Sequence, residues 1–544
     1  MRRLAYAVIL AALVVPETSR AQRVAGAGDD ALPIPRGGLR IVVSGLWNDY
    51  AERLDAAGTR TRLFAGLASD SAGVGLVPGL APTQQALRIL TGQSGYRLSL
   101  GALTADGEVR QSIAPIAIEY GVLRRLSIRA LLPYAESRDL NQLLLNRTGT
   151  GANVGVNPAF GATGASARAT NAALLGQIDA ARSQLTAELA RCAAPTAANC
   201  TTLRANGSGA QALLARALDM RTALQQVYGT ANRGASPVVP LTASTAHQAV
   251  VSTVAALRSD FSSLGITAIP ANAAPAGATL VMGPGGITRI GTDSSFGIGY
   301  ATLGNTRRAG LGDIDLSASF LLLDTFASDP VGRLLTGRRG IRSGFTMGWR
   351  FGVAGADRTE DAFDVPIGEG ANALLVRSTT DLMASRSLWM SATIRATLPR
   401  PDRMALGVPT VQSPSPFVPF EVVQTTRTLG SRIDLELAPR YAIGEFFGVS
   451  GALLHRRWGA DRYAAVEPST VLSEPLELPG RSLTSAAVGV SFSTLASYAR
   501  GRSRLALEVL FTHLEPVAAG GEGSVAAVKT DRLELRVYTG FPRR

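Results

Sequence analysis

Apolar and polar residues alternate strictly in many short stretches of this chain. In residues 314–322 the apolar Leu316 and Phe320 alternate with the polar Asp315 and Ser317. Successive side chains of a β-strand point to opposite faces of a sheet, so such a stretch has one apolar and one polar face. The same two-residue period recurs in residues 345–353, 390–398, 433–437 and 532–537. The longer runs match the roughly 9 to 11 residues that a tilted membrane strand requires, whereas strands of soluble proteins usually have about 5 or 6.

This pattern predicts an all-β fold: a transmembrane antiparallel β-barrel of about 12 to 14 strands, with 14 favoured. The candidate strands are residues 39–48, 58–67, 96–104, 109–120, 126–137, 309–323, 342–355, 372–383, 387–399, 430–442, 446–458, 483–495, 503–515 and 528–541. Segment 58–67 is the weakest of them, which leaves 12 strands as the alternative. Short turns should join the strands at the periplasmic end of such a barrel, and longer loops should join them outside. The connections at 121–125, 384–386 and 443–445 are short, as expected of the periplasmic end.

Residues 160–270 differ from the rest because they are alanine-rich and have helical spacing. Three apolar stripes with this spacing predict three helices: Leu174, Ile178, Leu185 and Leu189; Leu213, Met220, Leu224 and Val227; Val250, Val254, Leu257, Phe261 and Leu264. Cys192 and Cys200 lie between the first two stripes, and in an oxidising compartment they predict a disulfide that closes a helical hairpin. Strand parity places this insert on the extracellular end. It could be a packed surface domain, a lid or plug over the pore, or a coiled-coil contact with another chain.

The first residues predict export. Arg2 and Arg3 precede an apolar run over residues 4–15, and Ser19 and Ala21 are small residues at the positions that a signal peptidase recognises. That run is shorter than the roughly 20 residues that a membrane-spanning helix needs, and no later stretch is long enough either. A mean hydropathy of +0.16 without such a stretch favours a barrel in the cell outer membrane of a Gram-negative bacterium. We therefore expect a signal peptide at 1–21, barrel strands at 22–159, the helical insert at 160–270 and the rest of the barrel at 271–544.

The excess of basic over acidic residues indicates which binding partners to expect. Lys and Arg number 54 against 41 Asp and Glu, which in a cytosolic protein would suggest nucleic acid. An exported chain does not routinely meet nucleic acid, so we expect none as a partner. The expected partners are outer-membrane lipids and lipopolysaccharide, whose phosphates suit arginine, together with the barrel-assembly machinery and an unknown small-molecule solute. His247, His455 and His513 are far apart in the sequence, so no metal site or other cofactor is expected.

The polar face of the predicted strands supplies the candidate functional residues. Charged side chains there would point into the lumen, where water or opposite charges surround them; on the lipid face an Arg would cost about 2–4 kcal/mol. The candidate pore-lining residues are Glu119, Arg129, Asp315, Arg350, Arg395, Asp434, Glu436, Glu508, Arg532, Glu534 and Arg536. They could line a permeation pathway, or they could form a salt-bridged interior that conducts nothing. Their mixed signs predict no strong ion selectivity.

Two turn regions carry a resemblance to known proteins. Residues 118–128 (Ile-Glu-Tyr-Gly-Val-Leu-Arg-Arg-Leu-Ser-Ile) end one strand, turn tightly and begin the next, and residues 310–314 (Gly-Leu-Gly-Asp-Ile) open another strand. Both resemble the outer-membrane proteins of the meta-pathway of phenol degradation and, more loosely, the long-chain fatty-acid transporter barrels. The resemblance covers the strand segments and not the helical insert. It implies a barrel of 12 to 14 strands that is a channel for small or hydrophobic compounds.

Three functions are consistent with these observations. The first is a passive channel for small molecules, hydrophobic or aromatic ones included by resemblance alone. The second is a structural or surface-interaction barrel with a plugged lumen that displays the helical domain. An outer-membrane enzyme is third: Glu508 and Glu515 lie near His513, but no serine or aspartate completes a catalytic site. We therefore expect no catalytic residues.

Overall fold

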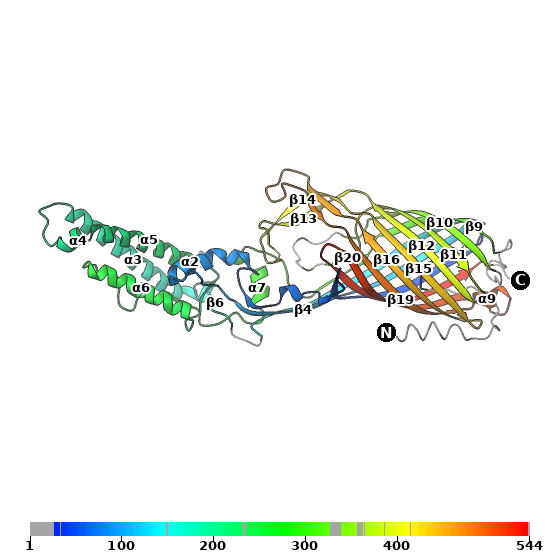
Figure 1. Ribbon diagram of the computed structural model, residues 1–544, viewed down its shortest axis with the longest axis horizontal. Coiled ribbons are helices and arrows are strands. Elements are labelled where there is room, and N and C mark those ends of the chain that lie inside the picture. Colours follow the sequence, from blue (N-terminus) through cyan, green and yellow to red (C-terminus); the bar gives the residue numbers. More distant parts are fainter. Residues whose placement is uncertain are drawn as a thin grey trace.

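The computed structural model describes residues 27–541, except 33, 148–150, 232–234, 327–338, 356–358, 360–362, 364, 386 and 414. The predicted signal peptide lies outside the described residues. The molecule has two parts, a barrel and a long arm that extends from one end of it (Figure 1).

Twelve antiparallel strands in the described chain close into the barrel. In ring order they are β1 (Leu39–Asp55), β21 (Ser524–Thr539), β20 (Ala506–Gly521), β19 (Arg481–Ser493), β16 (Phe447–Trp458), β15 (Arg432–Ile443), β12 (Leu388–Pro399), β11 (Ala373–Met383), β10 (Gly340–Phe351), β9 (Ile314–Asp324), β5 (Leu126–Leu145) and β4 (Gly101–Leu123). Strand β1 pairs with β21 on one side and with β4 on the other, which closes the ring. A closed ring pairs the backbone groups that an open sheet edge would leave unsatisfied in lipid.

The barrel confirms the predicted fold class, but the number of strands is 12 and not the favoured 14. Segment 58–67 contributes only β2 (Arg60–Arg62), which pairs with the end of β1 outside the ring. Residues 101–104 of the segment 96–104 and the whole segment 109–120, counted as two strands, belong to the single strand β4, which begins at Gly101. The sequence pattern breaks at Ala105–Gly107, yet β4 continues there, because its pairing with β5 runs through these residues.

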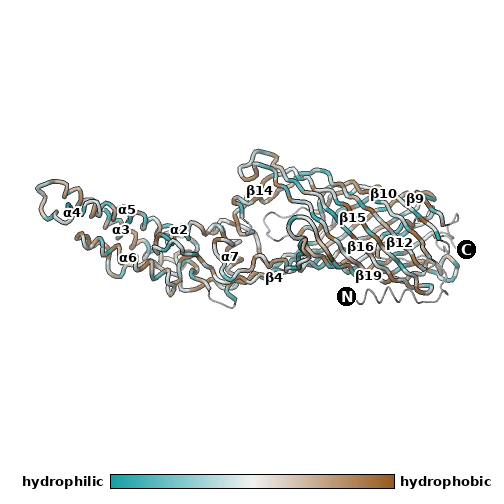
Figure 2. The backbone as a smooth tube through the Cα atoms, in the orientation of Figure 1, coloured by the Kyte–Doolittle hydropathy of each residue, from teal (hydrophilic) through white to brown (hydrophobic). Residues whose placement is uncertain are grey.

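The outer face of the barrel is apolar and its inner face is polar, as the alternation predicts. On β9, Leu316 is 47% exposed and Phe320 is 44% exposed, while Asp315, next to Leu316, bonds to Arg350 of β10. Figure 2 shows the alternation of hydrophobic and hydrophilic residues along the barrel strands. So large an apolar surface is unfavourable in water, whereas lipid chains cover it without loss.

The arm is built mainly of helices. They are α2 (Ala81–Thr91), α3 (Ala165–Cys192), α4 (Thr201–Ala205), α5 (Gly207–Val227), α6 (Thr245–Ser263) and α7 (Gly286–Thr292). The three predicted apolar stripes lie on α3, α5 and α6 and pack into one core, where Ile178, Val227 and Val250 have no exposed surface. The predicted disulfide is present: Cys192 and Cys200 are bonded, with 5.4 Å between their Cα atoms, at the turn between α3 and α4. None of the described helices is long and apolar enough to cross a membrane.

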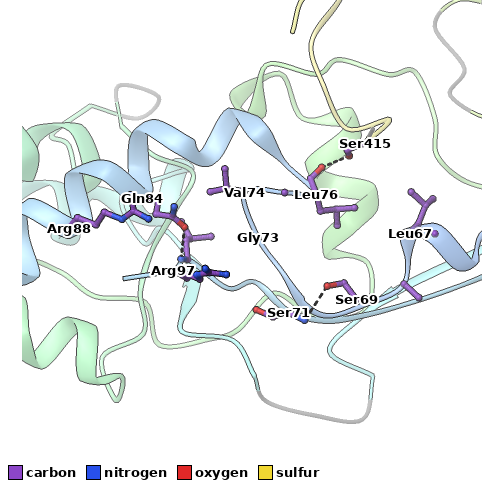
Figure 3. Close-up of a pocket in the computed structure, with 14 residues that line it drawn as sticks. Leu67, Ser69, Ser71, Gly73, Val74, Leu76, Gln84, Arg88, Arg97 and Ser415 are labelled. Carbon is purple, nitrogen blue, oxygen red and sulfur yellow. Dashed lines mark hydrogen bonds between the residues drawn. The ribbon is translucent and has the colours of Figure 1, made fainter. Parts of the chain in front are cut away.

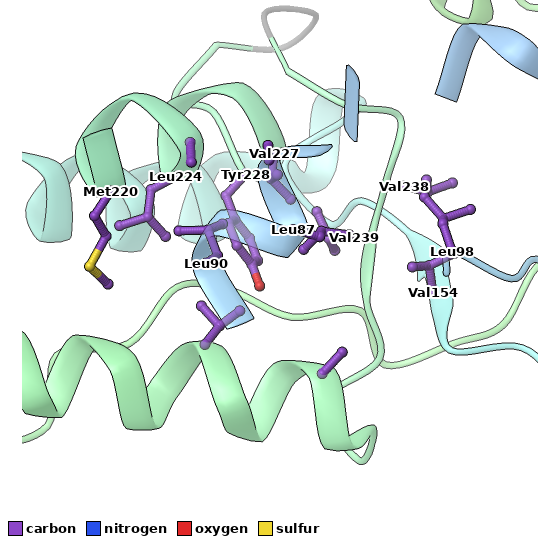
Figure 4. Close-up of a cluster of buried hydrophobic side chains, with 14 of the residues drawn as sticks. Leu87, Leu90, Leu98, Val154, Met220, Leu224, Val227, Tyr228, Val238 and Val239 are labelled. Carbon is purple, nitrogen blue, oxygen red and sulfur yellow. The ribbon is translucent and has the colours of Figure 1, made fainter. Parts of the chain in front are cut away.

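Two separate chain segments form the arm, which extends beyond residues 160–270. Helix α2 comes from the part assigned to the barrel, yet it packs against α5 and α6. Its Leu87 and Leu90 are fully buried beside Leu224 and Tyr228 (Figure 4). Residues 278–303, with α7, join the same core. We use "the arm" for the described residues of 65–100 and 151–303.

Smaller elements connect the parts. β3 (Ser69–Ala72) pairs with β4, β8 (Thr306–Leu311) pairs with β5, and β6 (Val154–Val156) pairs with β7 (Val238–Pro240) inside the arm. A second sheet contains β13 (Asp402–Pro409), β14 (Phe420–Thr428), β17 (Asp461–Ala465) and β18 (Leu476–Leu478). The short helix α9 (Leu495–Ala499) precedes β20.

A loop from the second sheet, which we call the clasping loop, holds the arm against the barrel. The described residues of 410–419 join β13 to β14, and Phe417 in this loop is fully buried in the arm's core. The Tyr300 hydroxyl of the arm donates a hydrogen bond to the carbonyl oxygen of Pro416 at 2.8 Å, and the Tyr300 ring stacks on Phe420 at 5.0 Å. Because apolar, stacking and hydrogen-bonding contacts combine here, the loop fixes the arm in place.

Candidate functional site

Oppositely charged side chains on neighbouring strands face each other on the inner wall of the barrel. Strand register places them: Arg350 of β10 pairs with Asp315 of β9, and its Nε lies 2.8 Å from Oδ1 of that residue. Arg395 of β12 lies 2.6 Å from Glu436 of β15. Such cross-strand pairs satisfy charges that the strand period directs inward. The wall therefore carries both signs of charge close together.

A segment that precedes β1 runs between these walls. The Oδ2 atom of Asp29 accepts hydrogen bonds from Arg377 of β11 and Arg395 of β12, both at 3.0 Å. The backbone N–H of Asp29 donates to Glu436 at 3.0 Å. Arg440 of β15 donates to the carbonyl oxygen of Gly28 at 2.8 Å. On this side, the segment thus bonds to three consecutive strands of the ring.

The same segment reaches the opposite wall at the next residue. Asp30 lies 3.3 Å from Arg536 of β21. In the ring order β21 and β11 are six strands apart, directly across the barrel. Since neighbouring residues bind opposite walls, the segment can only lie inside the barrel. We call the described residues of 27–35 the crossing segment.

The crossing segment fits its position closely. A Cβ atom on Gly28 would lie 2.1 Å from Oε1 of Glu436 and 2.7 Å from Cβ of Ala438, so a larger side chain would need the wall to move. The backbone N–H of Ala31 donates to Asp381 at 2.9 Å. Farther along, Ile34 is fully buried in a cluster with Leu32, Leu495, Ala499, Ala506, Tyr538 and Phe541. The segment is therefore packed at this end and bound by polar contacts in the middle.

A second group of charges surrounds Glu508, which is fully buried on β20. The Tyr538 hydroxyl donates to Glu508, and Arg536 lies 3.7 Å from it. Glu534 lies between Arg532 and Arg536 and also accepts a hydrogen bond from Ser44 at 3.1 Å. These contacts cross β1, β20 and β21, so they tie the strands together from the inside.

The structure brings most of the eleven candidate residues into a few polar groups. Asp315 joins Arg350, Arg395 joins Glu436, and Glu508, Arg532, Glu534 and Arg536 share the second group. Asp434 lies 3.1 Å from Arg456, and Glu119 lies 2.5 Å from Arg40 and accepts from Ser127 at 2.7 Å. Arg129 faces Glu119 across the β4–β5 pair. Their role in lining a path for solutes stays a prediction.

The sequence analysis missed several residues of this site. Arg377 and Asp381 lie on the inward face of β11, opposite Arg395 and Ser391 of β12, so the alternation alone could have identified them. Asp29 and Asp30 had no such signal, because they precede the first strand. Their partners are distant along the chain: Arg395 is 366 positions from Asp29, and Arg536 is 506 positions from Asp30.

Among the described residues, no group of three or more His, Cys, Asp or Glu side chains could hold a metal ion. The three histidines lie apart: His455 bonds to Thr484 at 2.9 Å, His513 bonds to Asp531 at 2.8 Å, and His247 lies in the arm. The site therefore consists of charged and hydroxyl side chains and the crossing segment.

A closed barrel with an apolar outer face and a polar inner face defines a membrane-spanning β-barrel of the outer-membrane type. No protein-family model and no curated protein matches this chain. Solved structures do: an outer membrane channel from Pseudomonas putida F1 is 8% identical over 96% of this chain and 98% of that one, with a TM-score of 0.37. A FadL homologue from Pseudomonas aeruginosa is 8% identical over 96% of this chain and 100% of that one, with a TM-score of 0.28. The toluene transporter TbuX from Ralstonia pickettii is 8% identical over 93% and 90%, also with a TM-score of 0.28.

Proposed function

We propose that this protein is a passive channel of the cell outer membrane for small solutes, and that the crossing segment closes its lumen. One observation carries the proposal: the two walls are bridged by a separate segment, through Asp29 on one side and Asp30 on the other. A barrel whose only role is structural could fill its interior with side chains from its own strands. A segment joined to the barrel at β1 can move without breaking the strand ring.

The strength of these contacts agrees with a movable closure. The side chains of Asp29, Arg377 and Arg395 are 32%, 23% and 26% exposed. Ion pairs that water reaches contribute about 0–1 kcal/mol each, because Coulomb attraction is screened and side-chain entropy is lost. On the Asp29 side, such contacts can hold the segment at rest and still yield to a solute, whereas the Asp30–Arg536 pair, 5% and 10% exposed, is the firmer anchor. The solute class, hydrophobic or aromatic compounds included, stays an expectation from the resemblance.

The arm would then project outside the cell. The first residue of β1 pairs with the last of β21 and with Tyr120 near the end of β4, whereas the arm joins β4 and β5 at Gly101 and Leu145. The arm thus extends from the end of the barrel away from these strand termini (Figure 1). In outer-membrane barrels with an even number of strands, the start of the first strand and the end of the last strand lie in the periplasm.

Conductance of the refolded protein in planar bilayers tests the channel. We expect the double variant Asp29→Ala/Asp30→Ala to open more often or to larger steps than the unaltered protein, because both anchors of the crossing segment are lost. Glu188→Ala is the matched control, since it removes an acidic partner of an arginine in the arm. It should conduct like the unaltered protein.

Heat-modified migration on gels establishes that each variant has refolded as a barrel. If the refolded double variant shows no conductance, the result would contradict the channel proposal. It would leave the second candidate, a closed barrel that presents its arm to a partner. The arm's own core, disulfide and clasping loop favour this candidate over an unstructured insert.

A further inference from the structure

A cavity of about 590 Å³ lies in the arm, apart from the lumen. Its walls come from residues 66–76, from α2 and the chain after it, and from Ser415 of the clasping loop. Small-molecule sites commonly have volumes of about 300–1,000 Å³. The cavity is thus large enough for a compound of modest size, and it adjoins the loop that fixes the arm.

The charges of the lining have one sign. Arg88 and Arg97 line the cavity, and the residues that line it include no Asp or Glu. Arg88 uses its Nε to donate to the carbonyl oxygen of Tyr96 at 3.1 Å, which orients the guanidinium. Gln84 accepts from the N–H of Leu98 at 2.9 Å through Oε1, so its amide NH₂ is the part that can donate into the cavity. This side of the cavity therefore presents donors and positive charge.

The opposite side carries the apolar Leu67 and Leu76, together with two serines that have partners of their own: Ser69 Oγ accepts from the N–H of Ser71 at 3.2 Å, and the Ser71 hydroxyl donates to Ser99 at 3.0 Å. Figure 3 shows Leu67 and Leu76 across the cavity from Arg88 and Arg97, with Val74 between the two sides. The Ser415 hydroxyl donates to the carbonyl oxygen of Leu76, so its donor is already used there. A ligand that fills this space needs an anionic end and an apolar end.

We propose that this cavity binds a small amphipathic carboxylate, such as the anion of an aromatic acid. Arginine favours carboxylates because its planar guanidinium can offer two parallel N–H groups. The apolar side would contact the ring or chain of the ligand, and burial of that surface adds to the affinity. Binding here requires only the arm and its clasping loop, and it is independent of conduction through the lumen.

Isothermal titration of the full-length protein in lipid nanodiscs with sodium benzoate at neutral pH tests the site. We expect saturable binding, and we expect Arg97→Gln to raise the Kd about tenfold or more, as loss of a charge-assisted hydrogen bond does. Gly75 lines the cavity and has no atom within 4 Å of an added Cβ. Gly75→Trp should therefore fold normally and abolish binding by filling the space.

Arg182→Gln, which removes an arginine of α3 outside the cavity, is the control and should bind benzoate like the unaltered protein. Two further probes define the ligand class: inorganic phosphate and benzyl alcohol should each bind at least tenfold more weakly than benzoate. Benzoate binding that Arg97→Gln and Gly75→Trp leave unchanged, or no saturable binding at all, would overturn the proposal. Equal affinity for phosphate would refute the apolar requirement, and equal affinity for benzyl alcohol would refute the anionic one. Because the titration does not involve conductance, failure here leaves the channel proposal untouched.

Discussion

The barrel and the arm bury opposite kinds of side chain: the arm buries apolar side chains, and the barrel buries charged ones. In the arm, Leu87 and Ile178 are fully buried, as in any soluble domain. In the barrel the charged side chains of Glu508 and Arg342 are fully buried, while Leu435 on the outer face is 45% exposed. The chain uses the same residue types in both parts. The difference shows that the surrounding medium, lipid or water, decides which face of an element is apolar.

The largest expected effect concerns the core of the arm. Leu87→Ala should destabilise the arm by about 2–5 kcal/mol, because it removes a fully buried side chain and leaves a cavity. Limited proteolysis and far-UV circular dichroism would measure the loss of helix while gel mobility reports on the barrel. A barrel that unfolds together with the arm would contradict the presence of separate cores.

The sharpest comparison uses one substitution at two equally exposed leucines. Leu435 on the barrel and Leu218 on the arm are both 45% exposed. Leu435→Arg should cost about 2–4 kcal/mol in a bilayer, because the charge enters lipid, whereas Leu218→Arg should change stability by less than about 0.5 kcal/mol. Urea unfolding in lipid vesicles measures both. Similar costs at the two positions would show that the outer face of the barrel does not contact lipid as proposed.

A somewhat smaller effect is expected from the disulfide. Cys192 and Cys200 close a loop with a sequence separation of 8, and the double variant Cys192→Ala/Cys200→Ala should lose about 2–3 kcal/mol through the greater freedom of the unfolded chain. The thermal midpoint of the helical signal should fall, and the barrel transition should not move. A shift of the barrel transition would mean that the two parts unfold together.

The smallest effect is a pH dependence confined to the arm. Burial lowers the pKa of His247 on α6, so the folded arm binds a proton less readily than the unfolded chain. Its stability should therefore be full above the unfolded pKa of about 6.5 and should decline as the pH falls below that value. The thermal midpoint of the helical signal between pH 5 and 8 measures this, with His247→Gln as the comparison. A variant that declines as steeply as the unaltered protein would assign the effect to other groups.

Much of the fold follows from local pattern. The two-residue period in stretches such as 314–322 predicted the barrel strands and their lipid-facing side chains. The helical stripes predicted α3, α5 and α6, and the short spacing of Cys192 and Cys200 predicted their disulfide. Each of these depends on residues close together in the chain, whose geometry within a strand or helix is constant.

The candidate site was predictable only in part. The alternation indicated which charged residues of the strands point inward, such as Arg350 and Glu436. It could not indicate the crossing segment, because residues before β1 have no strand period and their partners come from the far end of the chain.

The sequence by itself determined most of the barrel strands, the three long helices of the arm and the faces they present, since the backbone periods of 2 and 3.6 residues convert order along the chain into faces. Tertiary structure alone decided that α2 belongs to the arm, that Asp29 and Asp30 bridge the lumen, and that Arg97 and Ser415 share one cavity. These arrangements join residues that are up to hundreds of positions apart. Closing such long loops depends on the free energy of all the contacts formed together, which no local pattern records.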